Sequence, residues 1–527
     1  MRRAALLFFI AVFLLFISGC GGQSSVTTSS TVTNTPAVQT TPVGMTVTDT
    51  PPAGVTVLFF QLSITGASLT PQSGTAVSLV SSSNAIPVDV SQLQTDSAFV
   101  GSQNVTAGTY TGLSVTFANP QLTIFNASDG SLGSTCAVGS VCELTFTTST
   151  SGPLTVNFSS SNSSLFPLTL SANSPLAFKL DIHLDTVIQN NLSLNLDATN
   201  GVTLSEVSTP QTGVPVPAVG KLTGTVESVT TSSNQFTLQT LEGRTFTIDV
   251  NGSTTYSDFP SGGSCSSSSE GFGCLAAQQV VNVTVTLQSD GSLLATAITY
   301  IQLPTQQTVE GTIVGLSTSG GNTIMDLIVQ KPPLSAAVSN VLPVGHHASV
   351  TVPSNGVTYE VGNPSTFSIP SGLTFSASSL QVGQEVLVVV QGSVTPATSS
   401  GNSNANDAGP LGRGEASFTA SAITLEESQI TGTVASAPNT TAGTFGLATM
   451  PGYFVPPSAT PGARPTWAPV IITVQTTGQT TFTNVSNLSG LAVNNVVSVG
   501  GFVFSTSGGV TVAAETVLLR PGPTPLF

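Results

Sequence analysis

The chain is 527 residues long, which is too long for one hydrophobic core and predicts about three to five domains. Its net charge is −15 with only nine Lys and Arg residues, so it lacks the basic surface that neutralises phosphates, and a nucleic-acid partner is excluded. Charged residues make up only 6% of the chain, and its hydrophobic residues alternate with Thr and Ser, which is the pattern of half-buried β-strands.

The N-terminus has the layout of a secretory signal peptide, which we place at residues 1–19. Two arginines precede an apolar run at residues 6–16, which is shorter than the roughly 20 apolar residues that a membrane-spanning helix needs. The sequence ISGC at residues 17–20 resembles the lipobox of bacterial lipoproteins. This resemblance implies cleavage before Cys20, diacylglycerol on its sulfur and a fatty acid such as palmitate on its amine. Several acyl chains anchor a protein stably to a membrane.

Residues 20–52 are rich in Ser, Thr and Pro and show no apolar periodicity, so we expect a flexible tether. An acidic chain is repelled by anionic lipid surfaces, so membrane attachment depends on the lipid at Cys20. We therefore expect a protein anchored to a membrane of the bacterial envelope, in the simplest case the outer membrane. Its folded part would lie in the periplasm or at the cell surface.

Residues 53–207 contain about eight or nine short strand-like segments separated by turn residues, which predicts an antiparallel β-sandwich. Within this segment lie VDVSQL at residues 88–93, VTAGTYTGL at 105–113 and LDIHLD at 180–185. These stretches resemble a bacterial family of lipoprotein domains of unknown function, numbered 4382. The family has no assigned activity, so the resemblance implies no site residues.

Asp181, His183 and Asp185 alternate along one predicted strand, which places their side chains on one face. Two carboxylates and an imidazole form a ligand set for a divalent metal ion. The alternative is a solvated polar face, with the intervening aliphatic residues turned into the core. We favour this alternative, because side chains two residues apart on a rigid strand lie about 6.6 to 7 Å apart, too far to converge on one ion. We expect no metal or other cofactor.

Four cysteines remain beyond Cys20, and they form two local pairs in Gly- and Ser-rich loops. Four cysteines allow three pairings, and an exported protein folds in an oxidising compartment. We predict the disulfides Cys136–Cys142 and Cys265–Cys274. Metal binding is the alternative, but the spacings C-x5-C and C-x8-C, with no His nearby, are not those of zinc sites.

A repeated pattern organises the rest of the chain. Gly224, Gly311 and Gly432 each open a Gly-Thr-aliphatic strand, and four further strand-like segments follow in the same order each time. We place the three copies at residues 220–303, 308–427 and 429–521. Five or six short strands per copy predict a small closed barrel, which leaves no sheet edge exposed. The pattern resembles a bacterial family of unknown function, numbered 5666, which implies small β-barrels in tandem. We therefore expect an all-β protein, a sandwich followed by three barrels.

The third copy is interrupted by a Pro-rich insertion at residues 450–469. This insertion contains Tyr453, Phe454, Arg464 and Trp467, the only Trp of the chain. Exposed aromatic side chains on a loop commonly hold a sugar or a peptide. The alternative, which we favour, is a flap packed on its own barrel, but this loop is the first choice for a binding site.

The sequence carries no signature of catalysis. It lacks a G-x-S-x-G elbow, a Walker loop and a dinucleotide fingerprint, and its carboxylates are scattered. We therefore expect a non-enzymatic, lipid-anchored envelope protein that acts as a binding or structural module, with a glycan or another envelope protein as its partner. One alternative is a carbohydrate-active enzyme, which a cluster of Asp and Glu in a concave site would favour. Another is a surface adhesin or assembly component.

Overall fold

The structure, a computed structural model, describes residues 39–50, 56–80, 85–93, 97–125, 141–145, 154–188, 194–240, 243–261, 265, 270–301, 307–331, 338, 341–362, 367–396, 416–449 and 471–520. Across these residues the chain is almost entirely β-strand, which confirms the all-β class predicted from the sequence. Within the same residues no helix is long and apolar enough to cross a membrane.

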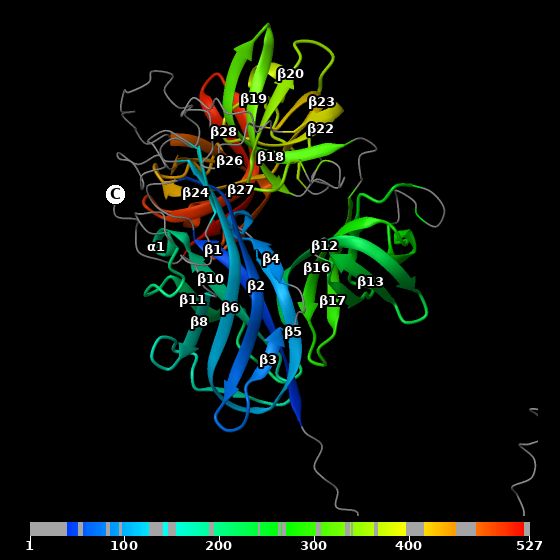
Figure 1. The fold of residues 1–527 in the computed structure, drawn as a ribbon, viewed down its shortest axis with the longest axis vertical. Helices are drawn as coiled ribbons and strands as arrows, with labels where there is room; N and C mark the ends of the chain where they lie inside the picture. The colour runs from blue at the N-terminus through cyan, green and yellow to red at the C-terminus, as the bar shows by residue number, and fades with distance from the viewer. Residues whose placement is uncertain are drawn as a thin grey trace, which may run out of the picture. The chain divides into compact units, whose positions relative to one another are not determined.

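The first domain is a β-sandwich (Figure 1). Its strands are β1 Thr40–Thr50, β2 Thr56–Pro71, β3 Val77–Val80, β4 Ile86–Asp89, β5 Ala98–Thr106, β6 Gly108–Phe125, β7 Val141–Thr145, β8 Leu154–Ser159, β9 Leu168–Leu170, β10 Leu176–His183 and β11 Val202–Glu206. One sheet has the order β3-β2-β6-β7, with β4 on β2 and with β8 and β9 on β6. The order β11-β10-β1-β5 forms the other layer.

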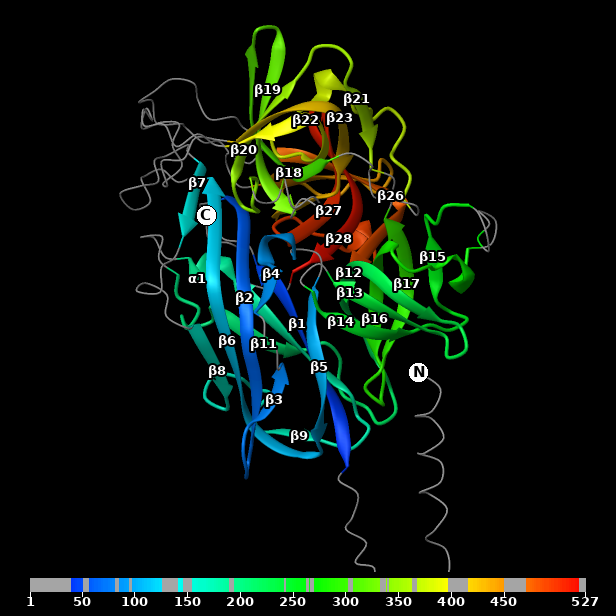
Figure 2. The ribbon, with the colours of Figure 1, turned by 45° about the vertical axis from the view of Figure 1, so that its right-hand side comes forward.

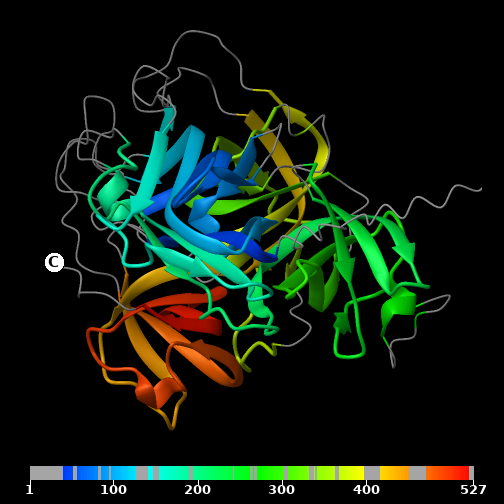
Figure 3. The ribbon, with the colours of Figure 1, turned by 90° about the horizontal axis from the view of Figure 1, so that it is seen from below.

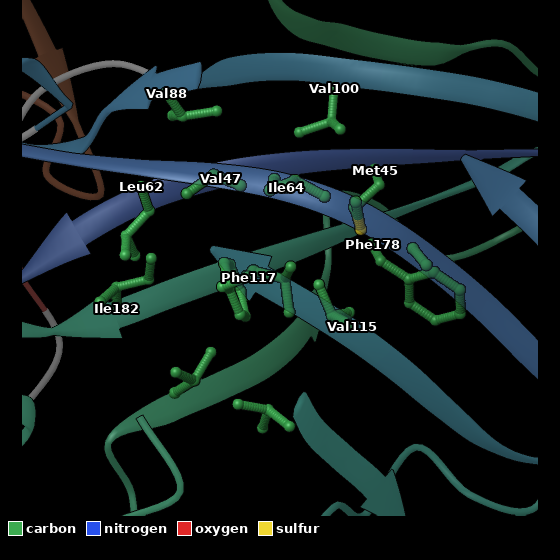
Figure 4. Packing of buried hydrophobic residues seen from close by; sticks show 14 of the residues in the cluster. Met45, Val47, Leu62, Ile64, Val88, Val100, Val115, Phe117, Phe178 and Ile182 are labelled. Atoms are coloured by element: carbon green, nitrogen blue, oxygen red, sulfur yellow. The ribbon is translucent and has the colours of Figure 1, made fainter. Parts of the chain in front are cut away.

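The two layers meet in one hydrophobic core, because alternate residues of each strand point inward. Met45 of β1 and Phe178 of β10 pack in the same cluster as Leu62 of β2 and Phe117 of β6 (Figure 4). Each of these side chains is at most 1% exposed. Burying an apolar side chain of this size contributes roughly 1.5–3 kcal/mol, so the core holds the two layers together.

The prediction of a tether over residues 20–52 is wrong for residues 40–50, which form β1. Val43, Met45 and Val47 alternate with polar residues and are almost completely buried. The buried Thr41 donates a hydrogen bond of 2.6 Å from Oγ1 to the carbonyl oxygen of Ser174. β1 pairs with β10 in parallel, so the sandwich is not antiparallel throughout. Residues 1–38, with the predicted signal peptide and Cys20, lie outside the described residues.

Three barrels follow, one for each predicted repeat. Barrel 1 consists of β12 Val216–Thr230, β13 Gln235–Thr240, β14 Thr245–Asp249, β15 Thr255–Ser257, β16 Val280–Leu287 and β17 Leu293–Ile301. Barrel 2 consists of β18 Thr308–Ser319, β19 Asn322–Lys331, β20 His347–Val352, β21 Thr358–Val361, β22 Glu385–Thr395 and β23 Ala416–Glu426. Barrel 3 consists of β24 Ser428–Val434, β25 Thr444–Thr449, β26 Ile471–Thr483, β27 Val496–Thr506 and β28 Gly509–Leu519. Figure 3 shows barrel 3, in orange and red, as a unit separate from the green barrel 1.

The strands of all three barrels pair in the same order. The short strands β15 and β21, which pair in parallel with β17 and β23, are left out of this count. The first strand then pairs with the second and the fourth, the second with the third, and the fourth with the fifth, all antiparallel. The third and fifth strands pair in parallel and close the ring. This five-stranded, mixed connectivity is that of the OB-fold, a small Greek-key barrel. The shared pairing order explains why the sequence repeats three times.

The repeated glycines lie inside the first strand of each barrel, not at its start. Gly224, Gly311 and Gly432 each pair with residues of both neighbouring strands. A Cβ atom at these positions would lie 2.2, 2.3 and 2.3 Å from a carbonyl oxygen of the second strand. Only a residue without a side chain therefore fits where the first strand passes from one neighbour to the other.

The barrels also pack against their neighbours. Phe502 and Phe504 of β27 belong to the hydrophobic core of barrel 2, and the rings of Phe502 and Phe367 are stacked with centroids 6.4 Å apart. Barrel 1 lies beside β5 of the sandwich, and Lys221 of β12 pairs with Ala98 of β5 (Figure 2). These contacts determine which barrel surfaces are covered by a neighbouring domain and which remain accessible.

Candidate functional site

The outer face of the second and third strands is the candidate binding surface of each barrel. In OB-folds this face, with the loops between strands 1 and 2 and between strands 4 and 5, holds oligonucleotides or oligosaccharides. Such a likeness of fold locates a surface and does not by itself assign a function. In this chain the three equivalent faces have different surroundings, and their differences decide which of them has room for a ligand.

The face of barrel 2 is covered by the sandwich. Ile328 of β19 is fully buried in a cluster with Leu58, Phe59 and Phe125 of the sandwich. Gln330, two residues further along β19, donates a hydrogen bond of 2.5 Å from Nε2 to the carbonyl oxygen of Leu58. This face therefore serves as a contact between domains.

The face of barrel 3 carries small side chains. Thr444, Gly446 and Ala448 of β25 pair with Gln475, Thr473 and Ile471 of β26. Ile471 is 65% exposed, so the sandwich does not cover this end of the face.

The face of barrel 1 opens onto a cleft of about 640 Å³. One wall comes from β13, β14 and the turn between β16 and β17, and the other from β3, β4 and β5 of the sandwich. The lining residues are Leu79, Val80, Ala85, Ile86, Val100, Gly101, Ser102, Gln103, Gln235, Gly243, Arg244, Thr245, Phe246, Thr247, Asp249, Gly291, Ser292 and Leu293. The cleft thus combines the strand face and the strand 4–5 turn that OB-folds use for ligands. We define it as the barrel 1 cleft.

An arginine joins the two walls of the barrel 1 cleft. Arg244 lies with its guanidinium 5.2 Å from the centre of the Phe246 ring. Its Nη1 donates hydrogen bonds to the carbonyl oxygens of Val100 at 2.6 Å and Phe99 at 3.4 Å. The Phe246 ring in turn packs against Phe99, with centroids 5.9 Å apart. A guanidinium stacked on an aromatic ring offers a ligand both a flat apolar surface and N–H donors.

A row of polar side chains lies along β13 and β14, on the face of β14 opposite to Phe246, which pairs with the buried Leu238 and packs against the core of barrel 1. Gln235 and Asp249 are opposite each other, and Gln235 Nε2 donates a hydrogen bond of 2.7 Å to Asp249 Oδ1. Thr245 and Thr247 are exposed on the same face. Amide, carboxylate and hydroxyl groups in one row supply both donors and acceptors, which suits a ligand with many hydroxyl groups.

The turn that closes this wall is held by its own carboxylate. Asp290 Oδ1 accepts a hydrogen bond of 2.9 Å from the backbone N–H of Ser292. The backbone and side-chain hydrogen bonds from Ser292 lower the pKa of Asp290, so the turn is stabilised by an ionised group. Gly291, between them, has a left-handed backbone with φ of +94° and lies against the side chain of Asn104 of β5.

Two family models match the chain. Residues 40–257 match a domain of unknown function, DUF4382, and residues 223–299 match another, DUF5666. The chain carries a DUF4382 domain followed by a DUF5666 domain. The resemblance of the first domain to family 4382 and that of the first repeat to family 5666 are thereby confirmed. The DUF4382 match begins at the first residue of β1 and ends in barrel 1, so it includes the lining residues of the cleft except those of the turn between β16 and β17. No curated protein matches the chain.

Two solved structures are distant matches. The wild-type single-stranded DNA binding protein from Thermus aquaticus is 14% identical over 42% of this chain and 95% of that one, with a TM-score of 0.13. A deletion mutant of that protein is also 14% identical, over 42% and 96% of the two chains, with a TM-score of 0.14. Scores this low carry no argument about this protein.

The predicted cysteine pairs have separate outcomes. Cys265 and Cys274, in the DUF5666 domain, form a disulfide with an S–S distance of 2.05 Å, as predicted. Cys142, in the DUF4382 domain, is disulfide-bonded. Its predicted partner, Cys136, lies outside the described residues, as does Cys20.

The proposed metal ligands do not form one row. Asp181 and His183 lie on β10, and their Oδ2 and Nε2 atoms are 3.9 Å apart. His183 Nε2 also lies 3.1 Å from Thr203 Oγ1 on β11. β10 ends at His183, and Asp185 falls in the one-turn helix α1, Leu184–Val187. The alternation therefore stops before the third candidate.

The aromatic insertion and the cleft lie in different barrels. Tyr453, Phe454, Arg464 and Trp467 lie outside the described residues, between β25 and β26 of barrel 3. The sequence does not predict the cleft residues, because a polar strand face gives no motif. One signal was available: Arg244 is one of nine basic residues in the chain and directly precedes a strand with Phe246.

Proposed function

We propose that this protein is a lipid-anchored binding protein of the bacterial cell envelope, and that it holds a glycan in the barrel 1 cleft. The observation that carries the proposal is the different setting of the three equivalent strand faces. Barrel 2 uses its face against the sandwich, whereas barrel 1 leaves its face open to a cleft lined by a stacked arginine and a polar row.

Charge favours a glycan over a nucleic acid in this cleft. Proteins that hold single strands line the groove with basic side chains and stack bases on aromatic rings. Arg244 is the only basic residue among the described lining residues, Asp249 adds a negative charge, and the whole chain carries −15. A neutral, hydroxyl-rich ligand fits these surroundings better than a polyanion.

The cleft also favours binding over hydrolysis. Most glycosidases need two carboxyl groups about 5 to 9.5 Å apart on either side of the bond that they cleave. Asp249 is the only carboxylate among the described lining residues. It already accepts a hydrogen bond from Gln235, which suits a residue that orients hydroxyl groups. A carbohydrate-active enzyme therefore remains the second candidate.

A glycan array tests the proposal. The mature chain without its lipid would be screened beside Asp249→Ala, which removes the carboxylate from the cleft. Gln475→Ala is a matched control, since Gln475 occupies the equivalent paired position on the barrel 3 face. We expect binding that Asp249→Ala weakens at least tenfold and Gln475→Ala leaves unchanged. Binding lost in Trp467→Ala and kept in Asp249→Ala would move the site to the insertion of barrel 3.

A further inference from the structure

Four charged residues gather on the outer face of barrel 2, away from the barrel 1 cleft. We define the junction cluster as Glu310 of β18, Lys331 of β19, Glu385 of β22 and Glu426 of β23. We propose that the junction cluster is a pH-sensitive latch between barrel 2, barrel 3 and the sandwich, closed when it holds protons and loosened when it loses them.

The sheet register brings the like charges together. Glu310 lies opposite Lys331, and their side chains form an ion pair. Glu385 lies opposite Glu426 on the neighbouring pair of strands. Like charges directly opposite each other destabilise a sheet, so this second pair needs compensation.

The compensation within the cluster is incomplete. The residue Glu385 is only 4% exposed, so its carboxylate is largely removed from water. Lys331, already paired with Glu310, has a side chain that is 57% exposed. One ammonium group therefore faces three carboxylates. A buried carboxylate whose charge is not fully compensated is costly when ionised, so it tends to keep its proton.

The elements around the cluster add negative charge. Besides burial, the charge of Asp89, on β4 of the sandwich, raises the pKa of Glu385. The charge of Glu427, which leads into barrel 3, adds to burial in raising the pKa of Glu426. Burial, reinforced by Glu310 and opposed by Lys331, holds the pKa of Glu385 well above its usual range. Burial and Glu310 likewise raise the pKa of Glu426 to about 8, against the effect of Lys331. The carboxylates that act on one another thus come from the sandwich, from barrel 2 and from the residue that leads into barrel 3.

The junction itself runs through the same residues. The backbone N–H of Glu385 donates a hydrogen bond of 3.1 Å to Oγ of Ser428, the buried first residue of β24 in barrel 3. Next to Glu385, Gln384 donates from Nε2 to the carbonyl oxygen of Val503 in β27 at 2.9 Å. Ionisation of Glu385 therefore places an incompletely compensated charge beside two of the hydrogen bonds between barrel 2 and barrel 3.

The direction of the pH effect follows from linkage. The folded state holds protons that the unfolded chain releases near the ordinary Glu pKa of 4.5. Stability from the latch is complete below that value and is lost as pH rises toward about 8, the folded pKa of Glu426. Barrel 3 is thus held firmly in mildly acidic surroundings and less firmly in alkaline ones.

Hydrogen exchange of the mature chain at several pH values between 5 and 9 tests this latch, with rates corrected for intrinsic chemistry. We expect peptides of β22 and β24 to lose protection at least tenfold between pH 5 and pH 9, while peptides of β13 and β14 keep theirs. Glu385→Gln and Glu426→Gln imitate the protonated acids and should remove most of that loss. Glu360→Gln, on the exposed face of β21, is the control and should behave like the wild type. Equal loss of protection in wild type and both cluster variants would overturn the latch.

Discussion

Arg244 of barrel 1 donates a hydrogen bond of 2.6 Å from Nη1 to the carbonyl oxygen of Val100 in the sandwich. This bond and the packing of Phe99 on Phe246 hold the two walls of the barrel 1 cleft at a set distance. The cleft therefore belongs to two domains at once, and the DUF4382 match likewise extends from the sandwich into barrel 1, as far as residue 257.

Arg244→Ala should loosen the cleft. The variant loses hydrogen bonds from a charged donor, worth about 1.5–3 kcal/mol, together with its stacking on Phe246. We expect a lower thermal midpoint and weaker glycan binding. Arg244→Lys keeps the charge but not the planar fork, and should recover only part of both losses. Wild-type unfolding and binding in Arg244→Ala would show that the two walls are held by other contacts.

The repeated glycines should not tolerate a methyl group. Gly311→Ala and Gly432→Ala each push a Cβ atom onto a carbonyl oxygen of the next strand. Overpacking of this kind costs roughly 1–3 kcal/mol, measured as a shift in the denaturant midpoint. Gly66→Ala in β2 is the matched control, because a Cβ atom there meets nothing within 4 Å. Equal midpoints for all three variants would contradict the close approach of the strands.

These glycines also show what the sequence reveals and what it hides. The Gly-Thr-aliphatic repeat predicts three barrels because the same crowded strand crossing recurs in each. In β1 the alternation of apolar and polar residues is interspersed with Thr, Pro and Gly, which are also typical of linkers. The sequence therefore predicts a tether where residues 40–50 form a strand. The cleft was not predictable, because it depends on how Arg244 and Phe246 face β5, a contact about 145 residues away along the chain.

Loss of the disulfide in barrel 1 should destabilise that barrel. Cys265 and Cys274 are nine positions apart, and closing a loop of this size stabilises a fold by about 2 to 3 kcal/mol in the chain-entropy model. The double variant Cys265→Ala/Cys274→Ala should therefore unfold at a lower temperature than the oxidised wild type. Adding a reductant should lower the thermal midpoint of the wild type more than that of the variant, because the variant has no Cys265–Cys274 bond to reduce. An unaltered midpoint in the double variant would show that the bond adds no stability.

Glu143 of β7 should give the contact between sandwich and barrel 2 a dependence on acid. Its Oε2 lies 3.1 Å from Nδ1 of His346, and its Oε1 accepts a hydrogen bond of 2.9 Å from the backbone N–H of His347. Burial raises the pKa of Glu143, but the hydrogen bonds and charge of the histidines outweigh burial and lower it. Stability from this carboxylate is therefore present above its unfolded pKa of 4.5 and lost as pH falls through the lower folded value.

Glu143→Gln should lower the thermal midpoint at pH 6, because a charge-assisted hydrogen bond is worth about 1.5–3 kcal/mol. The difference from the wild type should shrink as pH falls below 4.5 and the native carboxylate, whose pKa lies below that value, takes up its proton. A difference that stays constant from pH 6 to pH 3 would mean that the ionised form of Glu143 plays no part.

The lipid anchor is a prediction from residues 17–20 alone. Metabolic labelling with palmitate in a bacterial host should mark the wild type and not Cys20→Ala, and the variant should leave the membrane fraction. Ser18→Ala keeps the cysteine and serves as the control. Label that persists in Cys20→Ala would remove the anchor and leave the cleft proposal untouched.

The most direct test of the central claim is a calorimetric titration of the best glycan from the array into the mature chain and two variants. We predict a 1:1 complex, with affinity at least tenfold lower for the Gln235→Ala/Asp249→Ala variant, which strips the polar row from the barrel 1 cleft. Gln475→Ala, at the equivalent position of barrel 3, should bind like the wild type. Equal affinity for the wild type and the double variant would contradict a glycan site in this cleft.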